Sequence, residues 1–144
     1  MSIPNDEDDI RQIVAQQETA WNCDAVAYAE RFHPEGTFTN VFGDRYIGQE
    51  ACQARHAAIV AAFAKGSKAS LDVRRVFFAA PGMALVDIDC VLKDYVRLPP
   101  GLLPTPDGTL RTSLLQVLIK HDGEWRTVGY HNVDAKPLPT GART

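Results

Sequence analysis

The chain has 144 residues, of which 45% are hydrophobic and 23% are charged, and its formal net charge is −3. A chain of this length and composition can bury enough apolar surface to fold as one domain without a disulfide framework or a structural metal. The slightly acidic balance, without a basic stripe, excludes a nucleic-acid-binding class, because contacts to phosphates supply most of that affinity.

The beginning of the chain and its cysteines indicate a cytoplasmic protein. Residues 1–4 lack a positive flank, and no apolar run of a secretion signal follows them. No apolar stretch reaches the length of a membrane span, so we expect no membrane partner. Cys23, Cys52 and Cys90 are widely spaced and odd in number, which predicts reduced thiols that are buried as small hydrophobic residues.

The first 63 residues predict three helices. Asn5 is placed to cap the first, in which apolar residues recur at three- and four-residue intervals. Asp24 is placed to cap a short second helix, which ends at His33-Pro34-Glu35-Gly36 because proline disfavours helical geometry at the preceding residue. Residues 49–63 are good helix formers and predict a third helix with His56 on its apolar side.

The remaining segments predict strands. Residues 37–42 alternate so that Phe38, Asn40 and Phe42 share one face, and residues 45–47 return after a turn. Four longer strands are predicted at residues 71–78, 84–98, 109–120 and 125–133, with hairpin signals at 81–82 and 122–123. Residues 99–108 form a long, unexpectedly apolar loop, which is either a lid or an interface arm.

Helices followed by a run of antiparallel strands predict an α+β fold rather than an alternating α/β fold. We expect a single domain over residues 1–134 and a loose tail at 135–144. A bent sheet wrapped on helices leaves a concave space, which is a common place for a small-molecule ligand.

A series of short motifs in register carries a family resemblance: Trp21-Asn22, Phe32-His33-Pro34, Phe38 to Gly43, Gly48 before a helix with His56, Asp122 to Trp125, and His131-Asn132. This order resembles the nuclear-transport-factor-2-like superfamily, which includes ketosteroid isomerases and SnoaL-type polyketide cyclases, and within it the SgcJ/EcaC group. The resemblance implies a cone-shaped, cystatin-like fold in which three N-terminal helices pack on a strongly curved, mostly antiparallel sheet. It also implies a pocket for a hydrophobic molecule of polyketide or steroid size, no cofactor, and a homodimer formed through the sheet.

The fold is carried over more securely than the chemistry. Ketosteroid isomerases place a general-base aspartate where this chain has Asn40, and an amide cannot act as that base. Those enzymes also use a first-helix tyrosine as a donor, and the nearby positions here are Gln16 and Gln17. Isomerase activity of that particular type is therefore not expected.

The candidate site combines one histidine with several polar and aromatic residues. His56 and Asn40 are the candidate catalytic groups, and the candidate ligand-binding residues are Trp21, Tyr28, His131 and Asn132. Asn40 could instead bond to His56 or to the backbone, and His56 could be a satisfied core histidine. His131 and Asn132 are adjacent in a strand, so at most one of them enters the pocket.

Other polar residues are weaker candidates. Asp87 and Asp89 alternate with apolar residues and are expected on the outer face of the sheet, and Thr112 and Gln116 could lie on either face. No histidine or cysteine spacing matches a metal site, so no metal is expected.

Three functions remain open. The chain could bind and convert a hydrophobic metabolite by cofactor-free proton transfer, as an isomerase, cyclase or dehydratase would. It could bind such a metabolite without turnover, as an accessory protein. It could also be a dimeric association module with a vestigial pocket, whose surface would comprise Leu85, Val91, Leu115, Val117 and Ile119.

Overall fold

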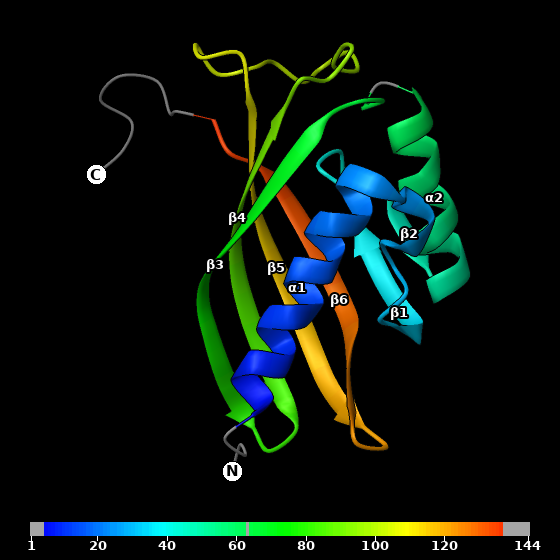
Figure 1. Cartoon of the computed structure of the whole chain (residues 1–144), viewed down its shortest axis with the longest axis vertical. Coiled ribbons are helices and arrows are strands. Elements are labelled where there is room, and N and C mark those ends of the chain that lie inside the picture. The colour runs from blue at the N-terminus through cyan, green and yellow to red at the C-terminus, as the bar shows by residue number, and fades with distance from the viewer. Residues whose placement is uncertain (1–4, 63, 137–144) are drawn as a thin grey trace.

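A six-stranded sheet curves around one long helix, and a second helix closes the side of the cone (Figure 1). The computed structural model describes residues 5–62 and 64–136. The elements are α1 (Asp6–Cys23), the 3₁₀ turn η1 (Ala25–Ala27), β1 (Phe32–Thr39), β2 (Arg45–Ile47), α2 (Gln49–Ala62), β3 (Lys68–Ala80), β4 (Met83–Lys93), β5 (Leu110–His121) and β6 (Glu124–Asp134). The predicted tail falls largely on residues 137–144, which lie outside the described range.

The strands are ordered β2-β1-β6-β5-β4-β3. Only the pairing of β1 with β6 is parallel, and the other four pairings are antiparallel. The predicted α+β class with a curved, mostly antiparallel sheet is therefore confirmed.

The prediction of three helices is wrong, because the second one is only the turn η1. Side chains from the two true helices bond to the backbone carbonyls of this segment, where a helix would use its own N–H groups. Gln16 Nε2 donates to Ala27 O at 2.9 Å, and Gln49 Nε2 donates to Ala29 O at 3.1 Å. The chain then leaves the turn early, because Phe32 already pairs with β6.

The start of β1 is irregular, and the register with β6 shifts between Phe32 and Thr37. The sequence His33-Pro34-Glu35-Gly36, predicted as a helix stop, forms this bulged part of the strand. Proline has no N–H for a ladder bond, which suits a bulge. A Cβ on Gly36 would lie 2.8 Å from the carbonyl oxygen of Thr127, so only glycine allows this close approach to β6.

Helix α1 is fixed to the sheet at both ends. Near its start, the buried carboxylate of Asp6 accepts bonds from Trp125 Nε1 at 3.0 Å and Lys120 Nζ at 3.1 Å. Near its end, Asn22 Oδ1 accepts a bond from Ala69 N at 2.8 Å. The predicted cap is wrong in detail, because the side chain of Asn5 makes no capping bond within the described residues.

A polar cluster in the core sets the register of α1 on the sheet. The buried amides of Gln17 and Gln116 bond to each other at 2.7 and 3.3 Å, and Thr127 Oγ1 donates to Gln116 Oε1 at 2.8 Å. These bonds satisfy groups whose burial without partners would cost about 1–3 kcal/mol each. Thr112 and Gln116 thus belong to the inner face of β5, together with Leu114.

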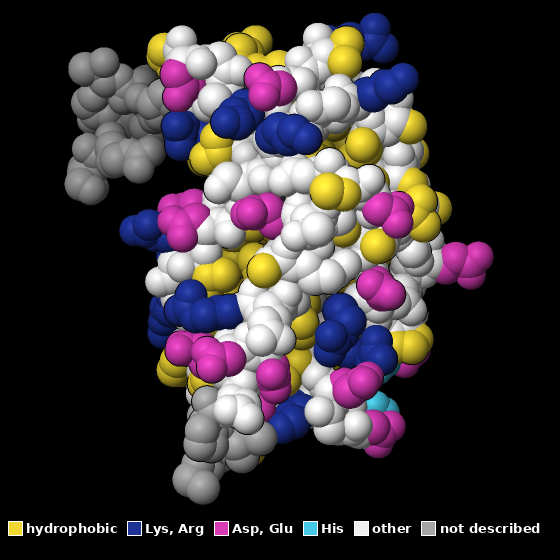
Figure 2. All heavy atoms as spheres, viewed as in Figure 1, with side chains coloured by type: hydrophobic (Ala, Val, Ile, Leu, Met, Phe, Trp, Pro, Cys, Tyr) yellow, Lys and Arg dark blue, Asp and Glu magenta, His cyan; other side chains and the backbone are white. Residues whose placement is uncertain are grey.

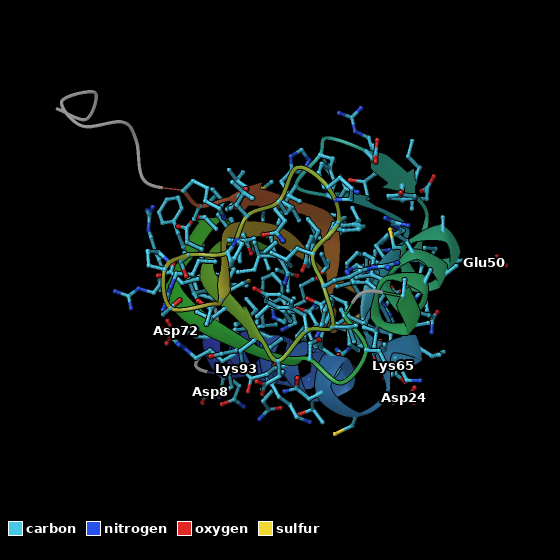
Figure 3. All side chains as sticks on the ribbon, turned by 90° about the horizontal axis from the view of Figure 1, so that it is seen from above. Asp8, Asp24, Glu50, Lys65, Asp72 and Lys93 are labelled. Carbon is cyan, nitrogen blue, oxygen red and sulfur yellow. The ribbon has the colours of Figure 1, made fainter. Side chains whose placement is uncertain are left out.

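The strands β3, β5 and β6 match the predicted ones within a few residues, whereas β4 is shorter than predicted. It ends at Lys93 because Asp94 adopts a left-handed backbone, with φ of 60°. Residues 94–109 then pass over the open end of the cone, as the yellow-green segment in Figure 3 shows.

The outer surface carries charges of both signs, interspersed on the face drawn in Figure 2. Asp89 lies on the outer face, where its carboxylate is 3.6 Å from Arg74. Among the described residues, no helix is long and apolar enough to cross a bilayer.

Candidate functional site

A cavity of about 120 Å³ lies between the open end of the sheet, α1, η1, α2 and the segment that follows β4. Its wall is mostly apolar, with a few polar groups, as in ligand sites generally. The lining residues are Trp21, Tyr28, Phe38, Asn40, Val41, Phe42, Arg55, His56, Ile59, Ala69, Leu71, Cys90, Val91, Leu92, Leu102, Leu110, Thr112, Tyr130 and Asn132.

Aromatic rings form one side of this cavity. The His56 imidazole stacks on Tyr28, with ring centroids 4.2 Å apart, and lies 4.5 Å from Phe38. The Tyr130 ring stands edge-on to Tyr28 and Phe38. These contacts hold His56 in one orientation and remove water from around it.

His56 is neutral near pH 7 and has a defined tautomer. Its Nδ1 lies 2.9 Å from the carbonyl oxygen of Cys52, one turn earlier in α2. A carbonyl only accepts, so Nδ1 carries the hydrogen and Nε2 carries a lone pair. Burial lowers the pKa of His56 to about 4, against the opposing effect of this hydrogen bond, and the charge of Arg55 lowers it further. The imidazole is therefore a hydrogen-bond acceptor or base rather than a cation.

Two tyrosines share a short hydrogen bond in the same wall. The hydroxyls of Tyr28 and Tyr130 are 2.6 Å apart, and both residues are buried. Burial raises the pKa of each above its usual range. One hydroxyl donates to the other, so the pair keeps one further O–H donor. Sequence reasoning named Tyr28 but missed Tyr130, which occupies an inward position on β6 two residues before Asn132.

Asn40 lines the cavity and also holds the turn between β1 and β2. Its Oδ1 accepts hydrogen bonds from Phe42 N and Asp44 N, both at 3.0 Å. The backbone bonding considered as an alternative for this residue therefore exists. The amide nitrogen makes no hydrogen bond within the described residues, so it remains a donor for a ligand.

The side chains of the adjacent residues His131 and Asn132 lie on opposite faces of the sheet. Asn132 lines the cavity, and its Oδ1 is buried without a hydrogen-bond partner among the described residues. His131 is exposed on the outer face, where Nε2 lies 3.4 Å from Thr39 Oγ1. Of this pair, only Asn132 can contact a ligand in the cavity.

Trp21 contributes its ring rather than its N–H group to the cavity wall. Its Nε1 donates to Ser67 Oγ at 2.9 Å, and the indole stands edge-on to Tyr28 at 5.9 Å between centroids. The Cys90 thiol also faces the cavity, and burial raises its pKa to about 12, so it remains protonated. The expected burial of all three cysteines is wrong for Cys23, which is exposed.

Arg55 is a cavity residue that sequence reasoning missed. Among the described residues that line the cavity, it is the one with a formal charge. Its guanidinium lies over the Tyr46 ring, 5.6 Å from the centroid, and Nε is buried without a partner in the described chain. A signal was present, because Arg55 follows Cys52 by three residues and precedes Ile59 by four, which places all three on one side of α2.

The segment after β4 closes the top of the cavity. Leu102 is buried in the wall, whereas its neighbour Leu103 is 70% exposed. The lid alternative for the apolar loop therefore has a geometric basis. The cavity volume of about 120 Å³ is ring-sized, since an apolar cavity of roughly 150 Å³ holds a benzene molecule.

Solved structures with the same architecture are numerous. A domain of unknown function with a cystatin-like fold from Nostoc punctiforme has a TM-score of 0.80 and 24% identity, over 95% of this chain and 82% of that one. An uncharacterised cystatin-like protein from Caulobacter vibrioides has a TM-score of 0.76 and 28% identity, over 91% and 90%.

A ketosteroid isomerase-like protein from Erwinia carotovora atroseptica has a TM-score of 0.71 and 15% identity, over 94% of this chain and all of that one. A protein of unknown function from Shewanella oneidensis is described as nuclear-transport-factor-2-like, with a TM-score of 0.67. This chain has the nuclear-transport-factor-2-like, cystatin-like fold.

The fold that this resemblance implied is thereby confirmed. No known family matches in a scan of the chain, and a search of curated proteins finds no relative.

Proposed function

We propose that the cavity binds a small, mainly apolar molecule and that His56 removes a proton from it without a cofactor. The observation that carries this proposal is the neutral, buried imidazole, whose Nδ1 is bonded to Cys52 O and whose Nε2 keeps its lone pair. A general base must be unprotonated at the working pH. With a pKa of about 4, His56 is almost entirely unprotonated near pH 7.

The reaction class that suits these groups begins with proton loss from a carbon next to a carbonyl. Nε2 accepts the proton, and the negative charge that develops on the carbonyl oxygen needs donors. The Asn40 amide nitrogen, the Arg55 guanidinium and the remaining tyrosine O–H are the donors in the wall. Such stabilisation offsets the modest basicity of a histidine whose pKa is about 4. Isomerisations, aldol-type cyclisations and dehydrations of carbonyl compounds can begin in this way.

The elimination of 5-nitrobenzisoxazole tests this proposal, because it needs only a base and an apolar pocket. The base takes the C3 proton, the N–O bond breaks, and a coloured nitrophenolate forms. We expect catalysis that rises through about pH 4 and then levels, as His56 loses its proton. His56→Gln should lower the rate by about 100-fold or more. An unchanged rate in His56→Gln would show that another group is the base.

The alternative is a carrier with the same cavity and no turnover. Binding of a ring-sized ligand to the wild type without elimination or proton exchange at any pH between 4 and 8 would favour it. The SgcJ/EcaC resemblance is compatible with either role, because one fold hosts many functions.

We also propose that the protein forms a homodimer through the outer face of the sheet. Large apolar side chains are exposed there on several neighbouring strands: Phe77, Met83, Leu115 and Val133. Val91, also expected on this surface, pairs with the exposed residues Ser70 and Arg111, and it borders the cavity as well. Light scattering at micromolar concentration tests the proposal, and a monomer would overturn it. A cytoplasmic location likewise remains a proposal.

A further inference from the structure

One side chain in the mostly apolar wall of the cavity carries a formal charge. Arg55 lines it, and the residues in the described wall include no aspartate, glutamate or lysine. The guanidinium takes part in no ion pair with the described residues, and Nε is buried with no acceptor. A buried donor without a partner costs about 1–3 kcal/mol, and more if it is charged, so an acceptor is missing here.

The acidic side chains around the cone do not supply that acceptor. Asp24 near η1, Glu50 on α2 and Asp72 on β3 all extend outward in the view down the cone (Figure 3). Asp44 is exposed in the turn after β1, and its backbone is held by Asn40. The acidic side chains of the described chain thus leave the guanidinium open to an acceptor on a ligand.

A second group in the wall also lacks a partner. The side chain of Asn132 makes no hydrogen bond within the described residues, and its Oδ1 is buried. The amide can present either end, because its oxygen and nitrogen exchange places by a half-turn of the side chain. With the nitrogen toward the cavity, Asn132 adds a donor to those of Asn40 and Arg55, which together suit an oxyanion.

The rest of the wall limits the ligand to a small apolar body. The stacked rings of Tyr28, His56 and Phe38 provide a flat surface, and Leu102 closes the space above it. The volume of about 120 Å³ corresponds to a single ring or a short branched chain.

We infer that the natural ligand is a small carboxylate with a one-ring or short-chain apolar body, whose carboxylate binds Arg55. Guanidinium and carboxylate form paired, charge-assisted hydrogen bonds, which are about twice as strong as neutral ones. This inference rests on the proposed function and adds the chemical class of the ligand. A carboxylate near the guanidinium would also partly neutralise it and make the neighbouring His56 a stronger base.

Benzoate and benzamide are matched probes, because they share the ring and differ in charge. We expect calorimetry at pH 7 and low salt to show benzoate binding to the wild type at least about tenfold more tightly than benzamide. Arg55→Met, which keeps the apolar stem, should weaken benzoate binding by about tenfold or more and change benzamide binding by less than about threefold. Arg55→Lys keeps the charge and should retain part of the preference.

The control variant is Arg45→Met, because Arg45 is exposed on β2 and does not line the cavity, so benzoate binding should be unchanged. A thermal unfolding curve, recorded without ligand, shows whether each variant is folded. Equal affinities of the two probes, or benzoate affinity that survives Arg55→Met, would overturn the carboxylate inference and leave the cavity proposal standing. If neither probe binds the folded wild type, the proposed function itself fails.

Discussion

The imidazole of His56 lies nearly parallel to the phenol ring of Tyr28, with 4.2 Å between ring centroids and 15° between planes. The two residues come from different elements, since His56 is on α2 and Tyr28 follows η1. Their contact joins these elements at the cavity and excludes water from one face of the imidazole. It therefore contributes to the fixed orientation of the base and to the burial that lowers its pKa.

The pKa of His56 predicts how stability depends on pH. In the folded chain the pKa is about 4, below the ordinary value of 6.5, so the unfolded state binds a proton more readily between these values. The stabilisation is complete above pH 6.5 and is lost as the pH falls toward 4. The loss attributable to His56 should be about 2–3 kcal/mol between pH 7.5 and pH 4.5.

Urea unfolding of wild type and His56→Gln at both pH values measures this effect. The carboxylates titrate in both proteins, so the difference between the two free energies of unfolding isolates His56. We expect the wild type to lose more stability than the variant on acidification. Parallel pH dependences would mean that His56 is solvated in the folded protein.

The sequence predicted the architecture well because its signals are local and periodic. Alternation placed Phe38 and Asn40 on the inner face, and helical spacing placed His56 inside α2. The prediction of a second helix was wrong because backbone carbonyls of that segment accept bonds from the side chains of Gln16 and Gln49, which are distant in sequence.

The site was only partly predictable, because it is formed by contacts between residues that are distant in sequence. Tyr130, Arg55 and Leu102 line the cavity because of how separate elements meet, and no local pattern specifies that meeting. The sequence alone did not decide which of the adjacent residues His131 and Asn132 faces the cavity, because that depends on which face of the strand is the inner one. The partner of the Trp21 N–H group, Ser67, lies 46 positions away.

The hydroxyl pair of Tyr28 and Tyr130 should behave as a coupled unit. Tyr28→Phe or Tyr130→Phe alone leaves a buried hydroxyl without its partner and should cost about 1–2 kcal/mol of stability. The double variant removes both polar groups, so its cost should fall short of the sum by about 1 kcal/mol. Chemical denaturation of the four proteins measures this coupling, and additive costs would contradict a bond between the two hydroxyls.

Asn40 should have separable effects on stability and on binding. Asn40→Ala removes the acceptor of two backbone N–H groups and should lower stability by about 1–2 kcal/mol. Asn40→Asp keeps that acceptor and should remain close to wild type in stability. The aspartate lacks the amide donor and adds a negative charge, so benzoate should bind it more weakly than wild type. Denaturation and calorimetry together check this, and tighter binding by Asn40→Asp would contradict the placement of the donor.

Leu102 should control ligand release. Leu102→Ala removes most of a buried side chain from the cavity wall, which should raise the dissociation rate of a ring-sized ligand by about tenfold. Leu103→Ala is the matched control, because Leu103 is exposed and lies outside the wall. Fluorine NMR exchange with 4-fluorobenzamide measures the rates, and equal rates in both variants would show that residues 94–109 are not a lid.

The most direct test of the cavity is a crystal structure of the protein grown with benzoate. We expect the ring to lie against Tyr28 and His56 beneath Leu102, with the carboxylate within hydrogen-bonding distance of Arg55. An interior that stays empty of benzoate, with His56 Nε2 bonded to another residue of the chain, would contradict the account and favour an association module with a vestigial pocket.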